Sequence, residues 1–169
     1  MIVEQKKIQP VIEMKLFDER MYVELPEGTV VMPEDMIQQL YPYEKRPQYI
    51  YYQRREDCYF TFNLLEKSLT DKQVVEAIYA SFQVIEAAYP KSIIEHVNLV
   101  KIESERQCGW FSFQSPSLGM PRYNIMYVTS IDNRFMHGMC SCFLEDEKSK
   151  SRIKQVPLSI QVIQKGRGR

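Results

Sequence analysis

The sequence predicts an α+β fold, a three-layer α/β/α sandwich built around a mostly antiparallel sheet. Two late segments carry this prediction. Residues 123–130 alternate so that Tyr123 and Tyr127 share one face while Met126 lies on the other, and residues 134–144 also have apolar side chains on both sides. A strand that is apolar on both faces must be covered on both faces. Helical segments elsewhere in the chain can supply this cover, which favours two outer helical layers.

The 169 residues are expected to form one domain over 1–169, with a core at about 14–163 and a basic flexible tail at 164–169. A chain of this length buries about two thirds of the surface that its unfolded form exposes. The sequence contains no internal repeat, low-complexity tract or Gly/Ser linker that would divide it.

The first elements are two short strands and a short helix. Residues 14–17 and 21–25 flank the polar turn 18–20, a pattern typical of a hairpin. Pro33 can occupy the first helical position, where its fixed φ is suitable and its missing N–H is not needed, and Pro42 ends this helix.

A second hairpin is predicted from residues 48–53 and 58–66, which flank the polar turn 54–57. A long helix follows, in which Thr70 can cap and Gln73 can complete a capping box. Its predicted apolar face consists of Val74, Val75, Ile78, Tyr79, Phe82, Ile85 and Tyr89.

Four strands then form a predicted meander, and the turn between the last two is Asp132-Asn133, a type that hairpins prefer. The strands are expected at 97–104, 107–114, 123–130 and 134–144.

The closing segment is predicted to be helical, because apolar residues recur at helical spacing up to Ile163, although Pro157 should kink or divide it. An ion pair between Asp146 and Lys150 is expected at its start. In this arrangement the long helix covers one face of the sheet, and the N- and C-terminal helices cover the other.

The segment FMHGMCSCF, residues 135–143, holds one of two histidines and two of four cysteines. In a strand, Cys140 and Cys142 share a face and His137 points the opposite way, so the imidazole cannot join the two thiols around one ion. The cysteines are therefore predicted to be small buried hydrophobes, and no metal or cofactor is expected.

No catalytic residues are predicted, because the chain has no nucleophile elbow, zinc-protease motif or phosphate-binding loop. One alternative stays open: a small-ligand binder or thiol-dependent enzyme using Cys108, Cys140, Cys142 and His137, or Cys108 with His96 as base. Thiols that titrate near neutrality in a shared pocket would favour it.

Residues 41–57 interleave tyrosines with basic residues, and Tyr and Arg are enriched at protein interfaces. The candidate partner-binding residues are Tyr41, Tyr43, Arg46, Tyr49, Tyr51 and Arg54. The same mixture could stack on single-stranded nucleic acid. The favoured interpretation of the segment is an edge hairpin whose tyrosine rings are half-buried with their hydroxyls in water.

Twenty-two basic residues balance twenty-two acidic ones, which makes nucleic acid an unfavourable partner and favours another protein. No stretch is long and apolar enough to span a bilayer, and residues 1–17 lack the apolar run of a signal peptide. A cytoplasmic location is expected. The sequence specifies neither the partner nor the oligomeric state.

The order of these segments resembles a PsbP/Mog-type domain, including the bacterial DcrB-like branch. The resemblance covers residues 14–163. It is carried by FDERMYVELPEG, the aromatic strand CYFTFNLLE, the helix TDKQVVEAIYASFQVIEAAYP, the strands GWFSFQS and YNIMYVTS, the strand containing Gly138, and the closing helix.

The resemblance implies an α/β/α sandwich in a family that acts mostly by binding other proteins, among them a nuclear-transport GTPase, photosystem subunits and secreted effectors that need an adaptor. It implies no catalytic residues. The chain departs from exported members in lacking their lipoprotein or transit segment, which favours a non-enzymatic cytoplasmic adaptor or chaperone, for example in bacterial secretion.

Overall fold

A computed structural model of the chain describes residues 10–90, 93–103, 105–116 and 120–163, and the tail predicted at 164–169 lies outside these described residues. The strands are β1 (Val11–Leu16), β2 (Met21–Pro26), β3 (Val30–Val31), β4 (Tyr49–Gln53), β5 (Cys58–Ser68), β6 (Asn98–Lys101), β7 (Gln107–Ser115), β8 (Arg122–Ile131), β9 (Arg134–Phe143) and β10 (Gln161–Val162). The helices are α1 (Glu34–Leu40), α2 (Val74–Ala88) and α3 (Glu147–Leu158), with a short 3-10 turn, η1 (Asp71–Gln73), before α2.

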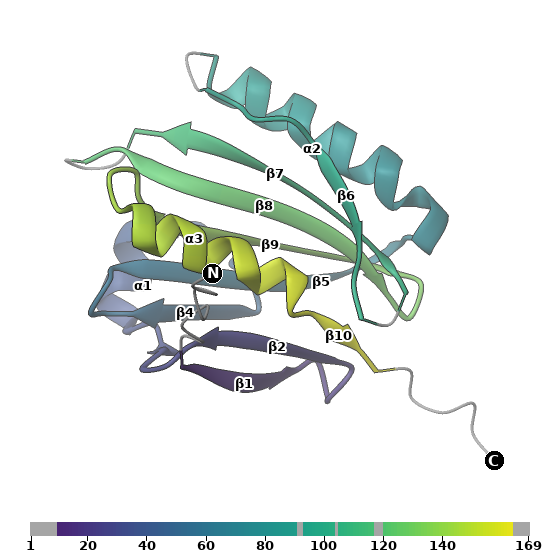
Figure 1. Cartoon of the computed structure of the whole chain (residues 1–169), viewed down its shortest axis with the longest axis horizontal. Coiled ribbons are helices and arrows are strands. Elements are labelled where there is room, and N and C mark those ends of the chain that lie inside the picture. The colour runs from purple at the N-terminus through teal and green to yellow at the C-terminus, as the bar shows by residue number, and fades with distance from the viewer. Residues whose placement is uncertain (1–9, 91–92, 104, 117–119, 164–169) are drawn as a thin grey trace, which may run out of the picture.

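The strands form two antiparallel sheets, so the predicted α+β class and sheet type are confirmed (Figure 1). The larger sheet has seven strands in the order β3-β4-β5-β9-β8-β7-β6, and the smaller has three in the order β1-β2-β10. Both predicted hairpins and the late meander are present. Asp132 and Asn133 have φ values of 49° and 55°, as a tight hairpin turn of the primed type requires.

The core consists of two apolar clusters, one on each face of the large sheet. On one face, strand residues such as Phe60 and Ile125 pack against Ile153 of α3 and Met21 of the small sheet. On the other face, Phe111 and Val128 pack against α2. The large sheet is therefore covered on both sides, as the apolar character of its late strands predicted.

The prediction that the N-terminal helix helps to cover the α3 face is wrong. Helix α1 has no buried residue. It lies behind the large sheet in Figure 1, whereas α3 lies in front of that sheet. The small sheet joins α3 instead, because its inward-facing residues Met21, Val23 and Leu25 are fully or almost fully buried.

Helix α2 begins as predicted, with Thr70 and Gln73 forming a capping box, in which the Thr70 backbone N–H donates to Gln73 Oε1 at 2.9 Å. Its buried face is narrower than predicted. Val74, Ile78 and Ile85 are buried, whereas Tyr79 is 51% exposed. The helix contacts β7 and β8, and the Tyr79 side chain lies outside this buried contact.

The closing segment is helical only to Leu158, so the prediction that Ile163 extends this helix is wrong. Pro157 lacks an N–H, and the helix ends one residue after it. The chain then becomes β10, where Gln161 pairs with Tyr22 and Val162 with Met21. Over so short a stretch, the spacing of the apolar residues fits both a helix and a strand. The sequence pattern therefore could not distinguish the two conformations here.

The expected ion pair between Asp146 and Lys150 is also wrong. Asp146 is the cap of α3, and its carboxylate accepts a hydrogen bond from the Ser149 N–H at 3.0 Å. A short acidic side chain at this position satisfies an N–H that has no partner inside the helix. Lys150 pairs with Glu147 at 3.1 Å.

Candidate binding site

One half of the α2 face of the large sheet is covered less completely than the other. Helix α2 packs on β7 and β8, towards one edge of the sheet. Next to it, Phe135, His137 and Met139 of β9 point to the same side and are only half-buried. Half-buried apolar side chains in the middle of a sheet mark a place where a further layer could pack.

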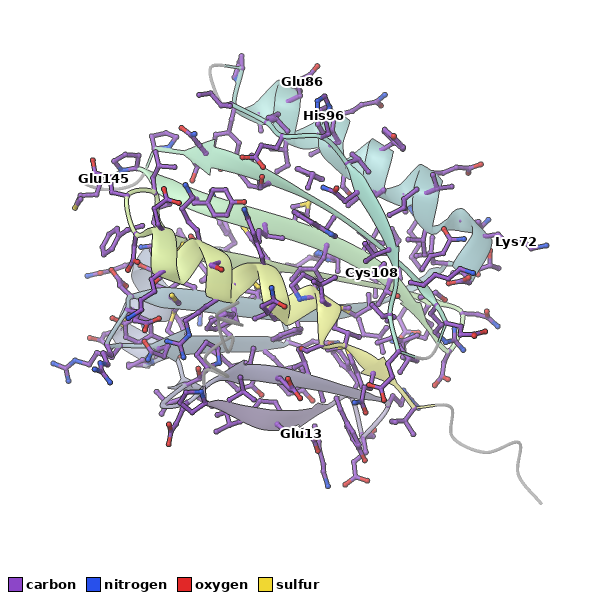
Figure 2. All side chains as sticks on the ribbon, in the orientation of Figure 1. Glu13, Lys72, Glu86, His96, Cys108 and Glu145 are labelled. Carbon is purple, nitrogen blue, oxygen red and sulfur yellow. The ribbon has the colours of Figure 1, made fainter. Side chains whose placement is uncertain are left out.

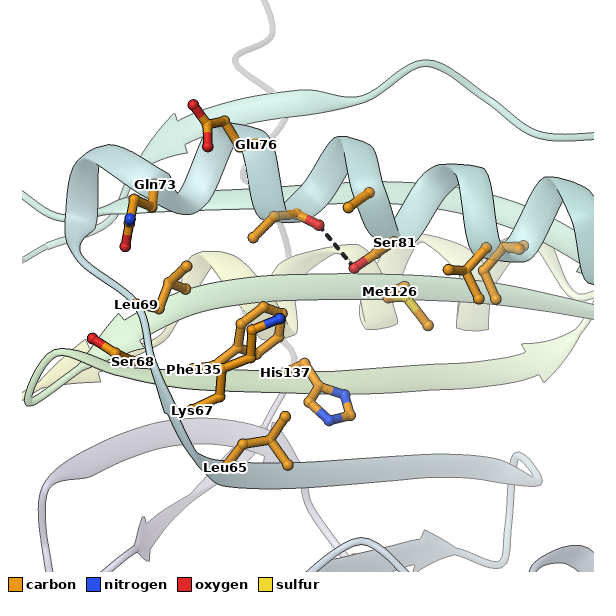
Figure 3. A pocket seen from close by; sticks show the side chains of 14 residues that line it. Leu65, Lys67, Ser68, Leu69, Gln73, Glu76, Ser81, Met126, Phe135 and His137 are labelled. Atoms are coloured by element: carbon orange, nitrogen blue, oxygen red, sulfur yellow. Dashed lines mark hydrogen bonds between the residues drawn. The ribbon is translucent and has the colours of Figure 1, made fainter.

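A groove with a volume of about 540 Å³ runs between α2 and these strands (Figure 3). Leu65, Met126, Phe135 and His137 line its floor. The wall consists of Gln73 at the end of η1 and one stripe of α2, formed by Glu76, Ala77, Ala80, Ser81, Val84 and Ile85.

The helix wall is unusual because it carries small, uncharged side chains from Ala77 to Val84. Val84 is 66% exposed. The Ser81 hydroxyl donates to the Ala77 carbonyl at 3.0 Å, so its hydrogen-bonding capacity is used within the helix. Solvent-facing helix surfaces are ordinarily rich in charged residues. This stripe therefore fits contact with another apolar surface better than contact with water.

Charged groups are confined to one end of the groove. Glu76 lies on the helix wall, and Lys67 lies opposite, with its Nζ 5.6 Å from the centre of the Phe135 ring (Figure 3). The other end, near Val84 and Ile85, is apolar. Apolar side chains predominate along the rest of the groove, where Ser81 and His137 also contribute to the lining.

Of the two histidines, His137 is the one that lines the groove, and its surroundings keep its ring neutral. Burial lowers its pKa. Its Nε2 lies 3.4 Å from the Asn63 amide nitrogen, which can donate only to an unprotonated ring nitrogen. Among the described residues that line the groove, Glu76 is the single carboxylate, and it lies on the opposite wall. Glu76 and His137 therefore do not lie side by side in the groove (Figure 3).

All four cysteines are buried, as predicted, and each is a free thiol in this structure. Cys140 and Cys142 belong to the α3 face of the sheet, opposite His137. Burial raises the pKa of Cys58 to about 11 and the pKa values of Cys108 and Cys142 to about 12. Thiols that hold their protons this strongly are poor nucleophiles at neutral pH.

The pairing of Cys108 with His96 is not present either. Cys108 is fully buried, whereas His96 is exposed, and the two lie apart in Figure 2. Among the described residues, no group of three or more His, Cys, Asp or Glu side chains is arranged to hold a metal ion.

The buried thiols predict a loss of stability in alkali. The Cys108 thiol has an ordinary pKa of 9.0 in the unfolded chain and about 12 in the fold, so the unfolded state releases its proton first. The contribution of this thiol to the free energy of unfolding is complete below pH 9 and is lost as the pH rises towards 12. Between these values the free energy of unfolding should fall by about 1.4 kcal/mol per pH unit for this thiol.

Urea unfolding of the wild type and of Cys108→Ala between pH 8 and 11 measures this effect. The variant should lose stability at every pH because a buried sulfur is removed, but its slope above pH 9 should be shallower. Equal slopes would show that Cys108 ionises as easily in the fold as in the unfolded chain. Alkylation of all four thiols should require unfolding at pH 8.

The Tyr/Arg residues predicted to bind a partner do not form one surface. Tyr51 is 6% exposed and packs on Phe62. Tyr49 packs edge-on against Phe17, whose N–H donates to the Tyr49 hydroxyl at 3.1 Å. Both rings face the small sheet. Their role in partner binding stays a prediction, and in this fold they hold the two sheets together.

The other four candidates lie outside that contact. Burial raises the pKa of Tyr41 to about 12, so this ring is largely withdrawn from solvent. Arg46 donates to the Tyr41 carbonyl at 3.1 Å and pairs with Glu34. Tyr43 is 68% exposed, and Arg54 is exposed in the turn between β4 and β5. Tyr43 and Arg54 are therefore the two candidates whose side chains are most open to a partner.

Sequence reasoning missed the groove. Its floor depends on which strands α2 leaves open, and a sequence pattern does not give that position. One signal was present: Ala77, Ala80, Ser81, Val84 and Ala88 form a stripe of small residues next to the buried face of the predicted helix. Such a stripe lets another element approach a helix closely.

The fold of the chain is similar to the folds of PsbP and Mog1, which confirms the fold that the order of its segments had suggested. Cyanobacterial PsbP from Synechocystis sp. PCC 6803 has a similar solved structure, with a TM-score of 0.63, 10% sequence identity, and coverage of 96% of this chain and 98% of that one. No protein-family model and no curated protein sequence matches the chain significantly.

Two structures of Mog1 are also similar. One, of a Mog1 point mutant, has a TM-score of 0.59 at 9% identity, covering 93% of this chain and 98% of that one. The other, of the Ran-binding protein Mog1p of Saccharomyces cerevisiae, has a TM-score of 0.54 at 9% identity, covering 91% and 96%. At these identities the likeness concerns the fold. Among the described residues, no helix is long and apolar enough to cross a membrane.

Proposed function

We propose that the chain is a non-enzymatic protein-binding domain, acting in the cytoplasm as an adaptor or chaperone, and that an apolar segment of its partner occupies the α2 groove. The observation that carries the proposal is the uncharged stripe from Ala77 to Val84 beside the half-buried floor of β9. A partner that covers both surfaces removes apolar area from water, which drives association.

The chemistry of the groove supports binding rather than catalysis. His137 is held neutral by burial and by its contact with Asn63. The thiols lie on the other face of the sheet with raised pKa values. The binding of Ran by one protein of the same fold is in keeping with a protein partner here.

The exposed members of the Tyr/Arg segment form a second part of the proposal. Tyr43 and Arg54 are exposed, which supports a role in contacting a partner. We therefore propose that they extend the interface beyond the groove, and that Tyr49 and Tyr51 act through the position of the β4–β5 hairpin. Replacing Tyr43 and Arg54 together with Ala tests this part, because neither side chain packs in the core.

The groove is tested by Val84→Glu. A partner captured from the native cell with the wild-type chain is purified, and its affinity for each variant is measured by calorimetry. Introducing a charge into the apolar end should weaken binding by about tenfold or more, because the carboxylate would be buried without a counter-ion. Glu is a good helix former, so the fold should be unchanged by circular dichroism.

Tyr79→Glu is the matched control. Tyr79 is also an exposed apolar residue of α2, but it does not line the groove. Its substitution should leave affinity within about twofold of wild type, in keeping with a site outside the interface. Equal losses for Val84→Glu and Tyr79→Glu would remove the groove from the proposal, and failure to recover any partner would remove protein binding itself.

A further inference from the structure

A second cavity, with a volume of about 390 Å³, lies where the β1–β2 turn meets β4, β5 and the start of β9. Asp18, Arg20, Gln48, Tyr49 and Arg134 provide its polar lining. It shares no lining residue with the α2 groove. Two guanidinium groups in one small cavity are unusual for a chain whose overall charge is balanced.

Arg134 is held in a fixed position beside this cavity. Its Nε donates to the Leu65 carbonyl at 3.1 Å, and its Nη2 pairs with Glu66 at 2.9 Å. The Glu66 side chain is 95% exposed, so water screens this pair and leaves much of the positive charge uncompensated. No acceptor among the described residues is assigned to Nη1.

Arg20 is close to a carboxylate but is not fully paired with it. Its Nε lies 3.0 Å from Asp132 Oδ2, although the buried Nε–H makes no hydrogen bond to a described residue. Neither Nη atom has an assigned acceptor among the described residues. A buried donor without a partner is unfavourable. Because the Nε–H is closed to solvent, a ligand oxygen in the cavity would meet the Nη groups of Arg20.

The backbone around the cavity is also strained. Phe17, Asp18 and Glu19 have consecutive φ values of 56°, 54° and 62°, in the left-handed region that side chains other than glycine disfavour. This turn meets the left-handed Asp132-Asn133 turn through the Arg20–Asp132 pair. Strained residues gather at binding sites more often than elsewhere, because the strain fixes the position of functional groups.

We propose that this cavity binds a small oxyanion, a carboxylate or phosphate compound that also carries a hydroxyl or amino group. The two guanidiniums supply paired N–H donors, the arrangement that recognises planar carboxylate or phosphate oxygens. The Tyr49 hydroxyl accepts from the Phe17 N–H and still has its own O–H to donate. Exposed Asp18 accepts the ligand's hydroxyl or amino group and opposes a plain dianion.

Calorimetric titration at constant ionic strength tests the proposal with two pairs of probes. Malate and glycerol 3-phosphate carry a hydroxyl, whereas succinate and methyl phosphate do not. We expect saturable binding of malate or glycerol 3-phosphate that is tighter than binding of its partner compound. The tighter of the two hydroxyl-bearing probes identifies the oxyanion as carboxylate or phosphate. No saturation beyond a sodium chloride control would overturn the proposal.

The variants locate the binding. Arg134→Gln should weaken it by about tenfold or more, because a charged hydrogen-bonding partner is lost. Arg46→Gln is the matched control, since Arg46 likewise donates to a backbone carbonyl and pairs with one exposed Glu, but outside the cavity. Asp18→Asn should reduce the preference for the hydroxyl-bearing probe, and Asn tolerates the left-handed backbone at this position. Equal affinity in Arg134→Gln and Arg46→Gln would place the anion elsewhere.

Discussion

Replacing Gly138 with Ala should lower the free energy of unfolding by about 3 kcal/mol, a large effect for a single methyl group. Gly138 lies in β9 directly opposite Tyr127 of β8. The Tyr127 ring crosses the glycine, and its hydroxyl donates to the Thr61 carbonyl of β5 at 2.8 Å. A Cβ at position 138 would collide with the tyrosine hydroxyl, a ring carbon and that carbonyl oxygen. Tyr127 is fully buried and has no room to move away.

Tyr127→Phe separates the two parts of this effect. Removing only the hydroxyl should cost about 1 kcal/mol, the usual value of a buried hydrogen bond to a carbonyl. In the double variant, the new methyl group meets a ring without a hydroxyl, so the additional cost of Gly138→Ala should be less than in the wild type. Chemical denaturation of the four proteins gives this coupling directly. A loss below about 0.5 kcal/mol for Gly138→Ala would contradict the packing described here.

Replacing Arg122 with Met should also lower the free energy of unfolding by about 3 kcal/mol, because a hydrogen-bonded, buried cation is lost. Its guanidinium donates to Ser141 Oγ at 2.8 Å and to the Asp57 carbonyl at 2.7 Å. It lies 4.1 Å from the Tyr59 ring centre and 4.9 Å from that of Phe143. Met fills similar space but leaves these acceptors without a donor.

A second measurement identifies the charge as the cause. Burial raises the pKa of Tyr59, and Arg122 partly offsets that rise. Ultraviolet titration should therefore find the Tyr59 pKa higher still in Arg122→Met. Arg54→Met, at an exposed position in the adjacent turn, should change stability by less than about 0.5 kcal/mol. If both variants lost equal stability, the buried contacts of Arg122 would not be the source.

Local chemistry explains why much of the fold could be predicted. The capping box at Thr70 and Gln73 and the Asp132-Asn133 turn each depend on a few adjacent residues, and the structure has both. The alternation in residues 134–144 likewise placed His137 and Cys140 on opposite faces. These features need no knowledge of what packs on them.

Features that depend on distant segments could not be predicted in the same way. Ile160 and Val162 are buried, but the sequence does not reveal that β2 is available to pair with their segment. Tyr51 was predicted to be an interface residue. The alternation of side chains along a strand defines two faces but does not reveal which face is covered. The groove exists because α2 covers only part of one face of the large sheet. The position of α2 on that face depends on the packing of the whole sheet.

The position of β9 between β5 and β8 has a consequence for the folding pathway. Strands β7, β8 and β9 are joined by short connections and can assemble from local contacts. Pairing β9 with β5 brings Tyr59 to Ser141 and Leu64 to Met136, and it closes a loop that contains α2 and the entire β6–β8 segment. Closing so long a loop carries a large entropic barrier. Docking of the N-terminal strands onto a preformed meander is therefore expected to limit the folding rate.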